Sequence, residues 1–202
     1  MEQGVKKLNK KKMKERIEGW FHPEEGKWYQ DQVKKFRGGW IVEIGCWKGL
    51  SISYLAPVLI GNPQRLWCID NWKGSKDQYA KLYRELLDQQ KSEGRPIPIQ
   101  FRENLKQLKI PHKILEIDSL EAVKNFQDES CSVVFLDASH DYLSITADLK
   151  SWWPKVRRKG ILAGHDFSND HPELIRAVES FSKEYSIPLK RGPRTIFYFI
   201  KP

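Results

Sequence analysis

The residues with the clearest capacity for chemistry directly follow an apolar run. Residues 133–136 read Val-Val-Phe-Leu, and the next five include Asp137, Ser139, His140 and Asp141. A carboxylate and an imidazole close together can exchange a proton, and imidazole changes its charge near neutral pH. The cluster therefore suits general acid–base chemistry, in which a side chain takes a proton from a reacting group or returns one.

A second polar pair follows another apolar run. Residues 160–164 are apolar or glycine, and His165 and Asp166 come immediately after them. In an open α/β sheet, ligands bind beyond the carboxyl ends of the strands. If both apolar runs are neighbouring parallel strands, Asp166 lies at the same sheet edge as Asp137 and His140.

A glycine turn follows the first apolar run, in the pattern Glu43-x-Gly45-x-x-x-Gly49. Glycines allow a tight turn and a close approach to a ligand, and free amides at a helix start favour an anionic group. The nicotinamide fingerprint needs three glycines spaced GxGxxG, so this pattern disfavours an NAD-dependent oxidoreductase. Asp70 ends the next apolar run, 21 residues after Gly49.

The elements that position these residues alternate along the chain. Continuous apolar runs indicate strands covered on both faces, and they lie at residues 40–44, 65–69, 113–117, 132–136 and 160–164. Helical periodicity occupies residues 49–59, 79–87, 142–152 and 174–185. We expect an α/β fold with a doubly wound, Rossmann-like, mostly parallel sheet of seven strands, closed by an antiparallel pair at residues 187–190 and 195–200.

The N-terminal region differs in composition from the rest. Residues 1–16 hold six Lys and one Arg against two Glu, which leaves only +4 of the net charge of +9 for the remaining chain. We interpret residues 1–37 as a basic tail and a capping helix, because Met13, Ile17, Trp20 and Phe21 recur at helical spacing before residues 22–26 break the pattern. Residues 38–202 form the main domain, with a helical insertion at 71–98.

Composition bounds the class of protein. At 202 residues and 40% hydrophobic content the chain suits one domain. No apolar run approaches the roughly 18 residues that cross a bilayer, and no secretory leader is recognisable, so we expect a cytoplasmic protein without membrane partners.

Cys46, Cys68 and Cys131 match no zinc spacing and are expected in the core. Nucleic acid is a disfavoured partner, because aromatic and basic residues do not interleave along one strand.

The glycine turn together with Asp70 resembles the class I methyltransferases that use S-adenosylmethionine (SAM). The residues 135–142, Asp148-Leu149, Trp153-Pro154, Lys159-Gly160 and 165–167 are similar to a branch that includes macrolide sugar O-methyltransferases, over about residues 38 to 170. The resemblance implies that the glycine turn packs under the amino acid end of SAM, that Glu43 supports the turn or binds the ammonium, and that Asp70 accepts the ribose hydroxyls. The cofactor site it implies comprises Glu43, Gly45, Cys46, Trp47, Gly49, Ser51, Asp70, Asn71, Trp72, Asp118 and Ser119, with Trp72, Asp118 and Ser119 at the adenine.

The same resemblance implies a catalytic centre. Acids at the ends of the fourth and fifth strands hold Mg²⁺ in metal-using members, which assigns Asp137 and Asp166 as metal ligands and His140 as the general base, with Asp137 beside it. His165 is a departure, because relatives usually place two acids or amides there. Magnesium prefers oxygen ligands, so a site that includes His165 leaves open Mn²⁺ or no metal at all.

The resulting hypothesis is methyl transfer from SAM to an oxygen of a small-molecule acceptor, such as a sugar or glycan unit. Two alternatives stay open. One is a SAM-binding fold without catalysis, and the other is a nucleic-acid-associated methyltransferase that uses the basic tail. A homo-oligomer is also left open.

Overall fold

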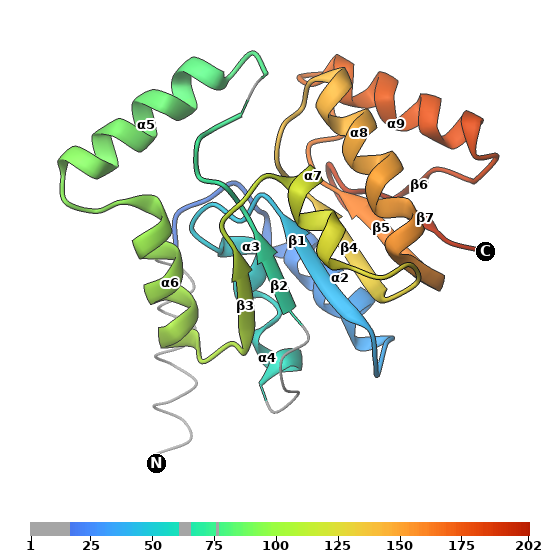
Figure 1. Cartoon of the computed structure of the whole chain (residues 1–202), viewed down its shortest axis with the longest axis horizontal. Helices are drawn as coiled ribbons and strands as arrows, with labels where there is room; N and C mark the ends of the chain where they lie inside the picture. Colours follow the sequence, from blue (N-terminus) through green and yellow to red (C-terminus); the bar gives the residue numbers. More distant parts are fainter. Residues whose placement is uncertain (1–16, 61–65, 76) are drawn as a thin grey trace.

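A computed structural model describes residues 17–60, 66–75 and 77–202 and shows a seven-stranded sheet between two layers of helices (Figure 1). The strands are β1 (Trp40–Ile44), β2 (Leu66–Ile69), β3 (His112–Leu115), β4 (Cys131–Leu136), β5 (Val156–Gly164), β6 (Lys190–Arg191) and β7 (Phe197–Ile200). Their order is β3-β2-β1-β4-β5-β7-β6, and β1 to β5 are parallel. β7 is antiparallel to both β5 and β6, so the predicted fold class is confirmed.

The helices divide between the two faces of the sheet. They are α2 (Pro23–Lys34), α3 (Leu50–Ser53), α4 (Ala56–Leu59), α5 (Ala80–Ser92), α6 (Ile97–Leu108), α7 (Ser119–Ala122), α8 (Tyr142–Trp152) and α9 (Pro172–Glu184). Side chains of α2, α3, α4 and α6 contribute to one hydrophobic core, and those of α7, α8 and α9 contribute to the other. α5 contributes no buried residue and lies apart from both layers (Figure 1).

Alternation along the central strands feeds both cores. In β1, Ile41 belongs to the first core, whereas Val42 and Ile44 belong to the second. Successive side chains of a strand point to opposite faces, which is why these strands read as continuous apolar runs. Each fully buried aliphatic side chain contributes roughly 1.5–3 kcal/mol to folding.

The strand register also places the functional residues. Ile44 pairs with Leu136, and Leu136 pairs with Gly164. The residues that follow these three positions therefore emerge side by side at the carboxyl edge of the sheet.

The first helix of the described residues, α2, lies later than the predicted one. Residues 17–22 are not helical, and Met13 lies outside the described residues. The stretch interpreted as a helix break is instead the first turn of α2, with Pro23 at its start. Proline suits this position because the first helical amide has no partner to lose. Glu25 accepts a hydrogen bond from the His22 amide at 2.8 Å, which fixes the start.

Two further differences concern the crossover and the sheet edge. α6 was not predicted, although Ile97, Phe101, Leu105 and Leu108 recur at helical spacing and are buried. β6 is shorter than expected and begins at Lys190. All three cysteines are buried and free. Among the described residues, the helices are too short or too polar to cross a bilayer.

Candidate active site

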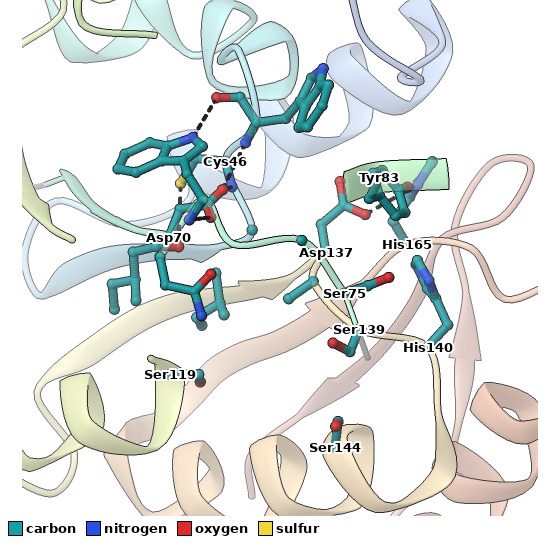
Figure 2. A pocket seen from close by; sticks show the side chains of 18 of the residues that line it. Cys46, Asp70, Ser75, Tyr83, Ser119, Asp137, Ser139, His140, Ser144 and His165 are labelled. Carbon is teal, nitrogen blue, oxygen red and sulfur yellow. Dashed lines mark hydrogen bonds and ion pairs between the residues drawn. The ribbon is translucent and has the colours of Figure 1, made fainter. Parts of the chain in front are cut away.

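A cavity of about 420 Å³ lies at the carboxyl ends of the central strands. Its volume falls within the range of small-molecule sites. The wall is formed by residues that follow β1, β2, β3, β4 and β5, together with parts of the N-terminal segment and of α5. The lining residues include Gly19, Trp20, Phe21, Gly45, Cys46, Trp47, Ser51, Asp70, Asn71, Trp72, Tyr79, Tyr83, Asp118, Ser119, Asp137, His140, His165, Asp166 and His171. Figure 2 shows this pocket from close by.

The glycine turn packs closely against the loop that follows β4. Gly45 has a φ of +84°, and a Cβ there would lie 2.0 Å from the carbonyl oxygen of Asp137. Gly49, at φ +86°, precedes α3. Both positions therefore favour glycine for reasons within the protein, since left-handed backbone and close packing exclude a side chain.

Asp70 is bound to the glycine turn (Figure 2). Its Oδ2 accepts hydrogen bonds from the amides of Cys46 at 2.8 Å and Trp47 at 3.0 Å, and its Oδ1 accepts one from the Trp72 amide at 2.7 Å. Burial raises the pKa of Asp70, and the three amides oppose that effect. The carboxylate thus joins the end of β2 to the turn after β1.

Glu43 lies beneath the turn. Its side chain is fully buried, and Ser51 donates a hydrogen bond to its Oε1. Burial raises the pKa of Glu43 to about 8, so the carboxyl is mainly neutral at pH 7. Ser51 lines the cavity, whereas Glu43 does not. This position suits the support of the turn better than contact with a ligand.

The residues predicted at the adenine, Trp72, Asp118 and Ser119, all line the cavity. Trp72 is nearly buried. The Asp118 carboxylate caps α7 by accepting from the Leu120 amide at 3.0 Å, and the Ser119 hydroxyl donates to Asp148. These two side chains are therefore engaged within the protein while still facing the cavity.

The two polar clusters meet as the strand pattern predicts. Nε2 of His140 lies 3.0 Å from Oδ2 of Asp166, and Asp137 emerges from the neighbouring strand. One ligand atom from each of Asp137, His140 and Asp166 can be chosen so that all lie within 4.8 Å of one another. Burial opposes protonation of His140, but hydrogen bonds to Asp166 and Asp77 raise its pKa to about 9.

Asp77 and Glu25 are site residues that sequence reasoning missed. Asp77 lies in the segment before α5, and its Oδ2 is 2.7 Å from Nδ1 of His140. Glu25, on α2, lies with Oε2 3.2 Å from Nε2 of His165. No local pattern marks either residue, because each contact joins segments far apart in the sequence.

His165 lies among three carboxylates. Its Nε2 faces Glu25, and its Nδ1 lies 3.2 Å from Oδ1 of Asp166 and 3.5 Å from Oδ1 of Asp137. Burial opposes its charge, but these acids raise the pKa of His165 to about 12. The imidazolium in turn helps hold the pKa of Asp166 well below its usual range, against the effect of burial.

Comparison with known proteins gives the family. The sequence profile of a family described as "Methyltransferase domain" matches residues 42–167, which is more than half of the chain. The chain belongs to this methyltransferase family. A curated relative, the uncharacterized protein y4gI of Sinorhizobium fredii, is 23% identical over 128 residues, which make up 62% of this chain but only 13% of that protein.

Solved structures share the fold of the methyltransferase. The O-methyltransferase NovP superposes with a TM-score of 0.66 at 19% identity, covering 88% of this chain and 78% of that one. CalS11, a TDP-rhamnose 3'-O-methyltransferase of calicheamicin biosynthesis, superposes with a TM-score of 0.55 at 18% identity, covering 87% and 76%. The family match confirms the predicted methyltransferase family, and the solved structures share its fold.

The donor set of the methyltransferase can accommodate a divalent metal ion. The candidate group contains two carboxylates and the imidazole of His140, whereas Nε2 of His165 lies 3.2 Å from Oε2 of Glu25. Two oxygens and one nitrogen suit Mn²⁺ better than Mg²⁺, which prefers oxygen alone. This candidate group shares Asp137 and Asp166 with the predicted set of Asp137, Asp166 and His165, and contains His140 in place of His165.

Three aromatic rings from separate segments form one side of the methyltransferase cavity. Trp20 lies 5.7 Å from Trp47 and 6.1 Å from Tyr83 between ring centroids, and Trp47 lies 5.9 Å from Tyr83. Trp20 is 61% exposed although it lines the cavity. We call these three residues the aromatic wall; it offers apolar faces to a ligand at the cavity mouth.

Proposed function

We propose that this methyltransferase transfers the methyl group of SAM to a hydroxyl oxygen of a small, sugar-like acceptor. The observation that carries the proposal is the meeting of His140 with Asp137 and Asp166 at the cavity wall, next to the glycine turn. The names of NovP and CalS11 support an oxygen acceptor, and that of CalS11 supports a sugar.

The cofactor would lie along the glycine turn. Asp70 would accept a ribose hydroxyl, while Trp72, Asp118 and Ser119 would surround the adenine at the far end. Cys46, Trp47, Ser51 and Asn71 would complete the wall around it. SAM carries a sulfonium and an ammonium, and a cavity edged by several aspartates favours such a cation electrostatically.

The chemistry needs a base close to the acceptor hydroxyl. Bound SAM supplies an electrophilic methyl group, and the protein must align the acceptor oxygen with it. His140 would accept the hydroxyl proton on Nε2, the nitrogen that faces Asp166. Because the pKa of His140 is about 9, most of the imidazole is protonated at neutral pH, and only the neutral fraction can act as the base.

A metal ion would be held by Asp137, His140 and Asp166. When bound, it would lower the pKa of the acceptor hydroxyl. Nε2 of His140 cannot bind an ion and accept a proton at once, whereas Asp137 would bind the ion through one carboxylate oxygen and could accept the proton on the other. Metal dependence therefore decides between two bases.

The aromatic wall would recognise the acceptor. A sugar ring has an apolar face of C–H groups and a rim of hydroxyls. The rings of Trp20 and Tyr83 match the face, and the carboxylates of Asp137 and Asp166 match the rim. Burial and then the charges of those two acids raise the pKa of Tyr83, so its phenol stays neutral at physiological pH.

Calorimetry followed by a methyl-transfer assay tests the proposal. We expect S-adenosylhomocysteine (SAH) to bind with measurable heat and NAD to give none. With labelled SAM, we expect transfer to glycosides but not to catechols or oligonucleotides, with and without added Mn²⁺. Heat from NAD in preference to SAH, or transfer only to oligonucleotides, would contradict the proposal; SAH binding without any transfer would support the non-catalytic alternative.

A further inference from the structure

Asp77 is a buried acid that the proposed chemistry does not yet use. Its side chain is only 4% exposed. Oδ1 accepts hydrogen bonds from the Ser75 hydroxyl at 2.7 Å and from the Tyr79 amide at 2.8 Å. A carboxylate held from its own segment in this way has a fixed orientation, and that orientation points Oδ2 at His140.

Oδ2 of Asp77 contacts His140 twice. It accepts hydrogen bonds from the backbone amide at 3.0 Å and from Nδ1 of the ring at 2.7 Å. These two bonds fix both the main chain and the ring of the same residue.

Both oxygens of Asp77 already accept hydrogen bonds from a hydroxyl or a backbone amide, so Nδ1 of His140 is the donor in this contact. Nε2 is then the nitrogen that can lose its proton and accept another. It faces Asp166 at 3.0 Å, on the cavity side. The ring of His171 lies against His140 with centroids 4.3 Å apart and limits its rotation.

We propose that Asp77 is the positioning residue for His140: it holds the imidazole with Nδ1 protonated and Nε2 directed at the acceptor hydroxyl. The effect on turnover rests on the proposed function, whereas the effect on the imidazole does not. The same logic applies when a histidine binds a metal, since its second nitrogen then usually donates to a carboxylate.

The proposal gives the helical insertion at residues 71–98 a role in assembling the site. Asp77 precedes α5, and His140 follows β4, so the contact joins segments 63 residues apart. The base is therefore complete only when the segment before α5 is in place. A purely structural role, in which Asp77 merely attaches this segment to the fold, is the alternative to be tested.

The test compares Asp77→Asn with Asp88→Asn, a control at an exposed position on α5. Asparagine keeps the size of the side chain but can donate to Nδ1, which favours the wrong tautomer. We expect turnover with a glycoside acceptor to fall by about 10²- to 10⁴-fold, a range typical of losing a general base. We expect the dissociation constant for SAH to change by less than about twofold, and the control to match wild type.

A spectroscopic measurement makes the test independent of turnover. With ¹⁵N-labelled histidine, the Nδ1 proton of His140 should give a shifted NMR signal, assigned by its loss in His140→Gln. That signal should be absent or displaced in Asp77→Asn and retained in Asp88→Asn. An unchanged signal in Asp77→Asn would overturn the proposal, as would a loss of SAH binding and thermal stability in step with turnover. If wild type transfers no methyl group, the proposed function fails while the NMR comparison still decides the role of Asp77.

Discussion

Replacing Asp70 is the perturbation whose effect on cofactor binding can best be worked from the structure. A carboxylate offers about four acceptor positions, and three of those on Asp70 are taken by the amides of Cys46, Trp47 and Trp72. One position remains for a ribose hydroxyl. The family resemblance implied that Asp70 accepts hydrogen bonds from both ribose hydroxyls. With one position left, the expected direct contribution of Asp70 to cofactor binding is half as large.

A single hydrogen bond to a charged group contributes about 1.5–3 kcal/mol. Asp70→Ala should therefore weaken SAH binding by about 10- to 150-fold through the lost ribose bond, and further through the loosened glycine turn. Asp70→Asn keeps one acceptor oxygen and should lose less. Isothermal calorimetry with SAH measures both effects.

The control is Asp88→Ala, which removes an exposed carboxylate from α5. Thermal melts without ligand report how far each variant disturbs the fold. If Asp70→Ala remains folded and binds SAH within about twofold of wild type, Asp70 does not contact the cofactor and the reasoning fails.

Three further predictions follow from burial and charge. The pKa of Glu43 is raised to about 8, so between about pH 5 and pH 8 the folded chain keeps this proton while the unfolded chain loses it. Relative to Glu43→Gln, the wild type should therefore lose about 1.4 kcal/mol of folding stability per pH unit in this range. Urea titrations measure the free energy of unfolding at each pH, and an equal dependence on pH in wild type and Glu43→Gln would contradict this. Because a base must be neutral, kcat/KM should rise about tenfold per pH unit up to about pH 9, and His140→Gln should abolish that limb while binding SAH normally. Trp20→Ala should raise the KM for a glycoside acceptor several-fold and leave SAH affinity unchanged, since its ring is at the cavity mouth; an unchanged KM would remove Trp20 from the acceptor site.

The central strands were predictable because they are buried on both faces. Residues 40–44 and 132–136 are continuous apolar runs with no competing helical period, and the structure places β1 and β4 there. Burial on two faces leaves a signal in every residue of a strand. The positions of Asp137 and Asp166 followed, because they come directly after such strands.

The supporting contacts of the site were not predictable in the same way. Asp77 and Glu25 lie in segments that were interpreted as an insertion and as a helix break. Their partners, His140 and His165, are far away in the sequence. Residues 17–22 are not helical as predicted, and the start of α2 was missed because Pro23 was interpreted as a break, although proline also begins helices. Such contacts depend on packing between elements, which one sequence does not display.

A crystal structure with bound SAH and Mn²⁺ tests the central claim most directly. We expect the ribose to contact Asp70 and the sulfur to point toward the cavity region bounded by Asp137 and His140. We also expect Nδ1 of His140 to remain on Asp77. SAH bound elsewhere on the molecule, or oriented with its sulfur away from His140, would contradict the account.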